Sequence, residues 1–291
     1  MSVQPAETVA VPGAHAPGAA ASVPHAERAA HLNVRGLRKR YGTDEADVLQ
    51  NAGFLLHEGE SLAVIGANGS GKSTMLRCCL RLIEPDAGDI HLLGQDVMAA
   101  RGPNLRRLRA QVGFVFQRHN LVPRLSVLSN VLHGAQARLS SPRNWFQATA
   151  PARLRVEALA CLDRVGLADL AGRRADRLSG GQSQRVAIAR TLMQRPRLVF
   201  ADEPAASLDP TAGEEVMELF AQLMRDEGIG VLFTCHDLTH AQRYGDRVLA
   251  LKRGQVMFDR RVGEVDFDQL RDLYAPSPSA DPAQPQEPRH V

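Results

Sequence analysis

The segment Gly66-Ala-Asn-Gly-Ser-Gly-Lys-Ser-Thr74 decides the fold class of this chain. Residues Gly66 to Ser73 fit the pattern G-x-x-x-x-G-K-[ST], a loop whose backbone N–H groups surround phosphate oxygens. The apolar run 60–65 before the loop predicts a buried strand, and apolar spacing over 72–83 predicts a helix. Strand, loop and helix together predict an α/β protein that binds a nucleoside triphosphate at the helix N-terminus. A glycine-rich turn before an ordinary helix is the weaker alternative.

Every residue of this loop is a candidate for nucleotide binding. Lys72 is expected to reach the β- and γ-phosphates, and the Ser73 hydroxyl to ligate Mg²⁺. The glycines allow the backbone to approach the phosphates closely. The predicted nucleotide-binding residues of the loop are Gly66, Ala67, Asn68, Gly69, Ser70, Gly71, Lys72, Ser73 and Thr74.

The composition bounds the class of protein. The chain has 291 residues, 44% of them hydrophobic, which is enough for one large core or two small ones. A net charge of +3 favours no particular polyanion. The basic cluster at 105–109 is interpreted as the solvated face of a helix, so no nucleic-acid partner is expected. No apolar run has the length that spans a bilayer, so work at a membrane would need a partner.

Cysteine and histidine spacing favours neither a disulfide framework nor a zinc site. No C-x-x-C pair occurs among Cys78, Cys79, Cys161 and Cys235. His236 and His240 could share a helix face, but no third ligand lies nearby in the sequence. Reduced thiols fit a cytosolic environment best.

The chain divides into a folded middle and two tails. Residues 1 to about 30 and 276–291 are rich in Ala and Pro without periodicity, which predicts disorder; an over-long start would look the same. Strands are expected near 32–40, 47–56, 60–66, 88–93, 112–117, 197–202, 230–235, 246–252 and 255–259. Helices are expected near 72–83, 126–136, 153–165, 181–194, 212–227, 238–244 and 267–274. Residues 118–178 lack a convincing strand and predict a helical subdomain inserted into an α/β core.

Two further segments carry groups suited to phosphate chemistry. The apolar run 197–202 predicts a strand ending in two acids. Asp202 is placed to hold the Mg²⁺ shell, and Glu203 to orient and deprotonate an attacking water. In Leu178-Ser-Gly-Gly-Gln-Ser-Gln-Arg185, Ser179 is a good N-cap and the two glycines after it predict a second anion site. An ordinary capped helix is the alternative for this second segment.

Polar side chains also end two other predicted strands. Gln117 follows the apolar run 112–116 and is a neutral group able to touch metal or water. His236 follows the run 232–235 and is a candidate donor to the γ-phosphate. Each signal is weak by itself, because a satisfied polar group at a strand end is common.

Taken in order, these segments resemble the ATP-binding subunits of ABC transporters over roughly residues 31–275. In that family they are the Walker A loop, the Q-loop at Gln117, the LSGGQ signature, the Walker B strand and the H-loop at His236. A sixth, the D-loop, matches Ser207-Leu-Asp-Pro210. Tyr41 matches the aromatic residue that stacks on adenine; a half-buried strand aromatic is the alternative. The resemblance implies a P-loop NTPase core with an antiparallel β subdomain, an inserted helical subdomain, and ATP and Mg²⁺ as cofactors.

The resemblance also implies a mechanism and partners. Two copies would pair head to tail, with ATP between the Walker A loop of one and Ser179, Gly180, Gly181 and Gln182 of the other. In this family the dimer closes when it binds ATP, and this closure drives integral-membrane permease subunits. A solute-binding protein acts through those permease subunits. The expected place is peripheral, on the cytoplasmic face of the cell (inner) membrane.

The segment 118–134 is very similar to that of phosphonate-import ATPases, as are the Trp145-containing insertion and Arg243-Tyr-Gly-Asp-Arg247. Trp145 is expected to pack within the helical subdomain rather than contact a permease. One departure is at Cys235 and Asp237 around His236, where phosphonate importers usually carry Leu and Gln. Other functions therefore stay open. They are import of phosphite or another reduced phosphorus oxyanion, import of polar amino acids, lipoprotein release, and the role of a non-transport ABC ATPase.

Overall fold

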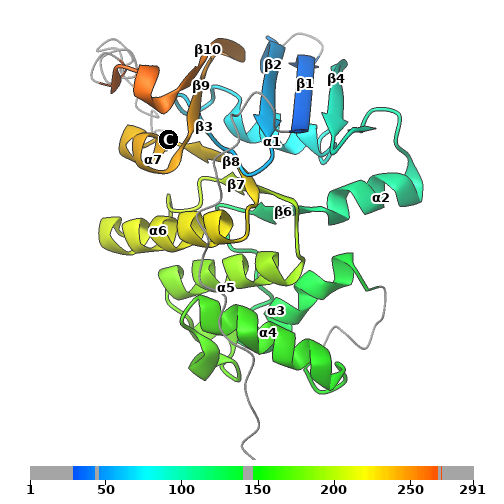
Figure 1. The fold of residues 1–291 in the computed structure, drawn as a ribbon, viewed down its shortest axis with the longest axis vertical. Helices are drawn as coiled ribbons and strands as arrows, with labels where there is room; N and C mark the ends of the chain where they lie inside the picture. Colours follow the sequence, from blue (N-terminus) through cyan, green and yellow to red (C-terminus); the bar gives the residue numbers. More distant parts are fainter. Residues whose placement is uncertain (1–28, 43–45, 140–146, 268–269, 271–291) are drawn as a thin grey trace, which may run out of the picture.

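The computed structural model describes residues 29–42, 46–139, 147–267 and 270. These residues form two β-sheets that lie beside one another, with a group of helices below the larger sheet (Figure 1). The predicted α/β architecture is confirmed. The terminal segments predicted to be tails, Trp145 and most of the expected helix 267–274 lie outside the described residues.

The larger sheet contains six strands in the described part of the chain, in the order β10-β9-β3-β8-β7-β6. All neighbours are parallel except β10, which runs antiparallel to β9. Strands of a parallel sheet that is covered on both faces have continuous apolar sequences, and the parallel strands of this sheet have such sequences. The strands are β3 (Ser61–Ile65), β6 (Val112–Val115), β7 (Leu198–Asp202), β8 (Gly230–Cys235), β9 (Arg247–Lys252) and β10 (Gln255–Arg261).

Alternate residues of these central strands serve two different cores. Leu62 and Val64 of β3 belong to a core shared with the second sheet and α1 (Lys72–Cys79). Ala63 and Ile65 belong to a core shared with the helices below. Because successive side chains of a strand point to opposite faces, one short strand joins both cores. The loop that follows β3 therefore starts from a rigid position.

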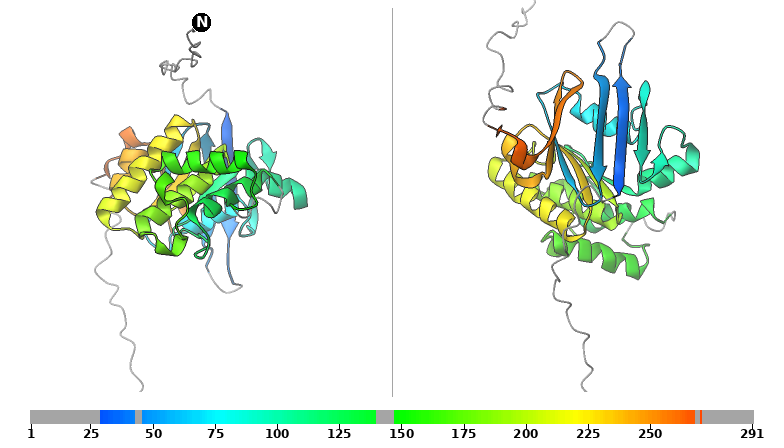
Figure 2. Two further views of the ribbon diagram at one scale, coloured as in Figure 1. Left: turned by 90° about the horizontal axis from the view of Figure 1, so that it is seen from below. Right: turned by 45° about the horizontal axis from the view of Figure 1, so that its top comes forward.

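The second sheet has the strand order β2-β1-β4-β5 and is antiparallel throughout. In β2, buried and exposed residues alternate, so one face packs on the core and the other faces solvent. The upright strands of this sheet are seen clearly in Figure 2. Its strands are β1 (Ala30–Lys39), β2 (Leu49–His57), β4 (Ala87–Leu92) and the short β5 (Gln95–Asp96), which was not among the predicted strands.

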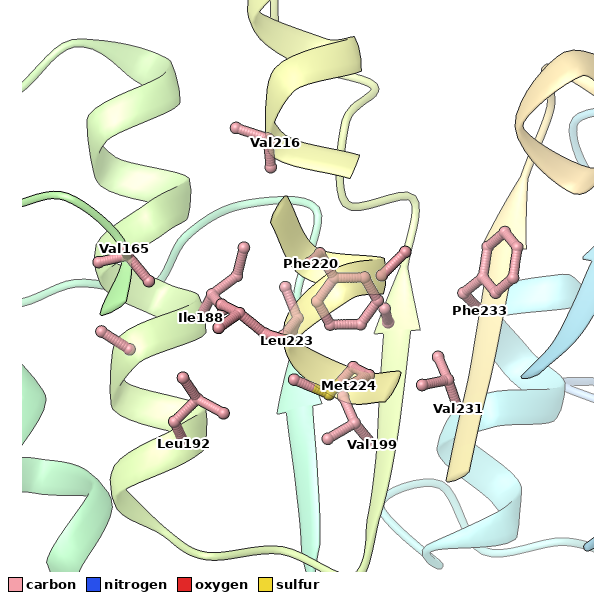
Figure 3. Close-up of a cluster of buried hydrophobic side chains, with 14 of the residues drawn as sticks. Val165, Ile188, Leu192, Val199, Val216, Phe220, Leu223, Met224, Val231 and Phe233 are labelled. Carbon is pink, nitrogen blue, oxygen red and sulfur yellow. The ribbon is translucent and has the colours of Figure 1, made fainter. Parts of the chain in front are cut away.

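Helix α6 (Pro210–Asp226) lies between the larger sheet and the lower helices. Figure 3 shows Met224 of α6 near Val199 of β7. Leu223, the residue before, lies near Ile188 of α5 (Gly180–Met193). The two sides of α6 thus join the sheet to α5.

Below α5 lie α3 (Val127–Leu132) and α4 (Ala152–Arg164), both packed on α5. Between Gln117 and α5, the described residues contain only these helices, short 3-10 turns and one isolated bridge, Ser126 to Arg174. The predicted inserted helical subdomain is therefore present. The remaining helices are α2 (Gly102–Ala110) and α7 (Leu238–Tyr244).

Three predicted elements differ in length from expectation, and the helix expected over 126–136 is α-helical only to Leu132 before a 3-10 turn at His133–Ala137. The helix expected over 72–83 ends at Cys79, because the chain leaves the helical region and Arg81 adopts a positive φ of 49°. The strand expected over 112–117 ends at Val115, so Gln117 lies beyond its end. None of the described helices has the length and apolar character needed to cross a membrane.

Candidate nucleotide-binding site

The glycine-rich loop is pressed against the end of β9. A Cβ atom on Gly66 would lie 2.3 Å from the Leu251 carbonyl oxygen and 2.6 Å from Ser70 Oγ. Gly71 immediately precedes α1 with a φ of 105°, a conformation that other residues rarely adopt. These two positions require glycine for steric reasons. The loop backbone is therefore held in one shape where helix α1 begins.

Lys72 lies folded back over this loop. Its ammonium group donates hydrogen bonds to the carbonyl oxygens of Gly66, at 2.8 Å, and Ala67, at 3.4 Å. Ser70 Oγ nearby is buried and has no hydrogen-bond partner among the described residues. The first N–H groups of α1 have no acceptor within their own helix. An ammonium, an orphaned hydroxyl and free N–H groups are the donors that a chain of phosphates needs.

Asp202 lies at the end of β7 and is 2% exposed. Its Oδ1 accepts hydrogen bonds from the Ser73 hydroxyl, at 2.7 Å, and from the Thr234 hydroxyl, at 3.0 Å. Its Oδ2 accepts a hydrogen bond from Arg77 at 3.3 Å. A carboxylate beside a hydroxyl is the oxygen donor set that Mg²⁺ prefers, so Asp202 and Ser73 fit that ion.

Glu203 follows in a constrained backbone. Its φ is 48°, and its N–H donates to Thr234 Oγ1 at 2.9 Å. The side chain lines a cavity of about 320 Å³ that is also lined by His236. His236 is exposed and comes directly after β8. The structure thus brings the predicted base and the predicted γ-phosphate donor to one cavity.

Gln117 lies two residues beyond the end of β6 and is exposed. Strand β6 pairs in parallel with β7, so both strands end at the same edge of the sheet. No hydrogen bond within the described residues joins Gln117 to Asp202 or Ser73. The fold brings Gln117 to the correct edge without joining it to the acid.

Tyr41 lies just beyond β1 and is 55% exposed. Its hydroxyl is 3.3 Å from the Thr74 hydroxyl oxygen, and the Lys39 ammonium lies 5.6 Å from the ring centroid. Tyr41 lies beyond the strand rather than within it, and about half of its surface is exposed. An exposed ring tethered beside the phosphate loop can stack on a base.

The segment predicted to form a second anion site lies at the start of α5. Ser179 and Gln182 make a reciprocal capping box, in which the Ser179 side chain accepts from the Gln182 N–H and Gln182 Oε1 accepts from the Ser179 N–H. Gly180, which is exposed, and Gly181, which is partly buried, lie between them. The predicted N-cap is confirmed.

This second site opens into its own cavity of about 530 Å³. The lining includes Ser179 to Gln182 and no residue from Gly66 to Thr74. Leu208 and Asp209 line both this cavity and the one that holds Glu203 and His236. Within the described residues of one chain, the loop Gly66–Thr74 and the predicted second anion site therefore do not share a cavity.

The sequence of residues 49–206 matches the family model described as ABC transporter. This chain belongs to the ABC transporter family. It is an ATP-binding protein and an ATPase, as the family's members are.

Two curated relatives of this ABC protein cover most of its length. It is 46% identical over 243 residues to the Phosphonates import ATP-binding protein PhnC of Nitratidesulfovibrio vulgaris, covering 84% of this chain and 91% of that one. It is 47% identical over 240 residues to the Phosphate-import ATP-binding protein PhnC of Mycolicibacterium smegmatis, covering 82% and 90%.

Among solved structures, the ABC protein is similar to the ATP-binding cassette MJ0796, described as a dimer in a post-hydrolysis state bound to ADP and Pi. The TM-score is 0.68 at 32% identity, and the match covers 79% of this chain and 98% of that one. That likeness extends over nearly the whole of the other protein.

Sequence reasoning missed three residues: Arg77 and Thr234, which contact the site of the ABC protein, and Arg190, which contacts the segment after Gln117. Arg77 lies one helical turn after Ser73, so i,i+4 spacing could have found it. Thr234 is the register partner of Asp202, which only strand pairing reveals. Arg190, from α5, donates to the carbonyl oxygens of His119 and Asn120. The last contact joins the signature helix to the segment after Gln117, and no sequence signal indicates it.

Proposed function

We propose that this protein is the ATP-hydrolysing subunit of an ABC importer for phosphonates. The observation that carries the proposal is its similarity to curated proteins named for phosphonate import, at 46% identity over 84% of the chain. Similar coverage and identity recur in relatives from Nocardia farcinica and Frankia casuarinae. The geometry of the site supports ATP hydrolysis as the reaction that energises this import.

Inorganic phosphate or another small phosphorus oxyanion is the second candidate. It is favoured by one relative, 47% identical, whose name specifies phosphate. The two candidates are chemically close, because both are tetrahedral phosphorus anions. In such importers the solute is read by the binding protein and the permease, so this subunit is compatible with either.

We propose a role in ATP binding for each of these site residues. Lys72 binds the β- and γ-phosphates, Tyr41 stacks on adenine, and Asp202 with Ser73 holds Mg²⁺, with Gln117 reaching the metal or its water. Mg²⁺ would neutralise charge on the phosphates. The burial of Lys72 and Asp202 and their contacts support these roles. The remaining nucleotide-binding residues are Gly66, Ala67, Asn68, Gly69, Ser70, Gly71 and Thr74.

Glu203 is the proposed general base. Its carboxylate takes the proton of the attacking water while His236 donates a hydrogen bond to the γ-phosphate. Their shared cavity supports this division of roles. Because the cavity is partly apolar, with Pro204 and Met217 in its lining, charges there interact more strongly than in bulk water.

We further propose that two copies are needed to complete each site. Ser179, Gly180, Gly181 and Gln182 would contact the ATP bound to the partner copy. The support is that the signature cavity is separate from the phosphate loop within one chain. The similarity to a cassette described as dimeric supports the same arrangement. ATP then closes the dimer, and hydrolysis releases it.

The proposed permease contact is a groove of about 370 Å³ beside the segment after Gln117. Phe114 and Phe116, stacked with ring centroids 4.1 Å apart, line it together with Asn120 and His133. Arg190 also lines the groove and fixes the backbone at 119–120. Such a contact would keep the subunit peripheral, on the cytoplasmic face of the membrane, with the solute-binding protein acting indirectly through the permease.

The test uses the complete transporter, purified with its membrane subunits and reconstituted in vesicles. ATP hydrolysis is measured with binding protein loaded with methylphosphonate, phosphite or phosphate, and with Glu203→Gln as the inactive control. Stimulation by methylphosphonate above the other two supports phosphonate import. Stimulation by phosphate alone selects the second candidate, and no stimulation by any of the three overturns both.

A further inference from the structure

A single buried hydroxyl joins the two acids of the site. Thr234 is 0% exposed and lies in β8, between β3 and β7. Its hydroxyl donates to Asp202 Oδ1 at 3.0 Å, and its Oγ1 accepts from the Glu203 N–H at 2.9 Å. A threonine hydroxyl has one proton to donate, and here that proton is committed to Asp202.

Strand register explains why these groups meet. Thr234 and Asp202 are direct partners across the parallel pair β7–β8. Leu232 and Phe200 lie two residues earlier in the same strands and on the same face of the sheet, in the apolar core that contains α1. Two polar side chains on such a face need partners, because an unpaired buried polar group is unfavourable. Thr234 and Asp202 satisfy one another.

The bond to Glu203 acts on a strained backbone. Glu203 has a φ of 48°, a left-handed conformation that costs a non-glycine residue energy. Such a conformation persists only where surrounding contacts hold it. The Thr234 hydroxyl holds the N–H of Glu203, and the Glu203 carbonyl accepts from the Ala206 N–H at 3.2 Å. The direction of the Glu203 side chain depends on this backbone.

We propose that Thr234 is a positioning residue for ATP hydrolysis. It fixes Oδ1 of Asp202 and the backbone of Glu203 in one arrangement, so that the metal-holding acid and the base keep a constant separation. The inference rests on the proposed roles of Asp202 and Glu203. Thr234 acts through its hydrogen bonds to these two residues.

An ordinary buried threonine would behave differently, and the chain contains one for comparison. Thr191 is 3% exposed and its hydroxyl donates to the Ala187 carbonyl within α5, at 2.9 Å. That bond is local to the helix and touches neither acid. Replacing either threonine by valine keeps the shape and removes the hydroxyl. Only Thr234→Val removes a partner from both Asp202 and Glu203.

The experiment compares Thr234→Val, Thr234→Ser and Thr191→Val in the full-length protein. We expect Thr234→Val to lower kcat by about tenfold to a hundredfold, because the buried Asp202 and the partly buried Glu203 each lose a hydrogen bond. The KM for ATP and the binding of a fluorescent ATP analogue in EDTA stay close to those of the natural protein. Thr234→Ser restores most of kcat, because the hydroxyl returns. Thr191→Val leaves kcat unchanged.

Hydrogen–deuterium exchange supplies a readout independent of activity. We expect the Glu203 amide to exchange at least about tenfold faster in Thr234→Val than in the natural protein or Thr191→Val. Unchanged exchange together with unchanged kcat in Thr234→Val overturns the inference, as does a serine variant that is as slow as the valine variant.

Glu203→Gln, assayed in parallel, separates this inference from the proposed function. If Glu203→Gln is inactive and Thr234→Val is normal, only the positioning role of Thr234 fails. If Glu203→Gln hydrolyses ATP at the natural rate, the assignment of Glu203 as base fails and the inference fails with it.

Discussion

The Lys72 ammonium nitrogen lies 3.6 Å from Glu203 Oε1, although the two residues are far apart in the sequence. The Lys72 side chain is 4% exposed and that of Glu203 17% exposed, so solvent screens the pair little. The proposed phosphate-binding cation and the proposed base thus stabilise one another's charge. A γ-phosphate arriving between them would compete with Glu203 for Lys72.

Lys72→Ala removes the cation. We expect transition-state stabilisation to fall by on the order of 3 kcal/mol or more, a loss of about a hundredfold or more in kcat/KM. Steady-state ATP hydrolysis measures the effect, and a thermal melt checks that the fold persists. Turnover at the natural rate in a folded Lys72→Ala protein contradicts the role given to Lys72.

Glu203→Gln keeps the size of the side chain and removes the base. We expect ATP to bind and hydrolysis to fall by about 10²- to 10⁴-fold, the usual contribution of a general base. ATP is then retained, and size-exclusion chromatography with ATP shows a dimer. Glu227→Gln, an exposed acid paired with Arg164, is the matched control and hydrolyses ATP normally. A Glu203→Gln protein that stays monomeric with ATP contradicts the proposed closure.

Gly181→Asp tests whether the second anion site serves a partner copy. A Cβ on Gly181 would lie 3.6 Å from Ala212 Cβ, an ordinary contact, so the fold tolerates the side chain. The new carboxylate repels phosphate. In the Glu203→Gln background we expect ATP binding to persist and the ATP-induced dimer to be lost. Gly172→Asp, where no heavy atom lies within 4 Å, is the control that still dimerises.

Tyr41→Ala removes the exposed ring beside the loop. Stacking of a base on an aromatic side chain contributes about 1–3 kcal/mol, so the Kd for ATP should rise by about 5- to 150-fold. Tyr41→Phe keeps the ring and loses only the contact with the Thr74 hydroxyl, and we expect a much smaller change. Equal affinities in all three proteins, measured by titration calorimetry, exclude stacking.

The buried His31 side chain should make the stability of the protein depend on pH. Burial lowers the pKa of His31 below its usual value, with Arg197 adding to the effect and Glu58 opposing it. The unfolded chain therefore binds a proton at higher pH than the folded protein does. This contribution to stability is complete above about pH 6.5 and decreases as the pH falls below that value. His31→Gln should flatten the fall of Tm between pH 7.5 and 5.5, and exposed His91→Gln should not.

Much of the site was predictable because its parts are local. The Ser179 capping box needs only four consecutive residues, and the loop from Gly66 to Thr74 needs only the strand and helix beside it. The end of α1 at Cys79 was not predictable in this way. Apolar spacing continues to Ile83, but the chain turns at Arg81, whose guanidinium donates to carbonyl oxygens at 97, 98 and 100. A tertiary contact outweighed the helical pattern there.

The sequence by itself determined the phosphate loop, the acids at the end of β7 and the capped helix that begins after Ser179. These features depend on hydrogen bonds between residues close in sequence and on the alternation of side chains between the two faces of a strand. Only the tertiary structure decided that Lys72 meets Glu203, that Thr234 bonds both acids, and that the signature opens into a separate cavity. Such contacts depend on which strands pair and in which register, and no local interaction specifies that choice.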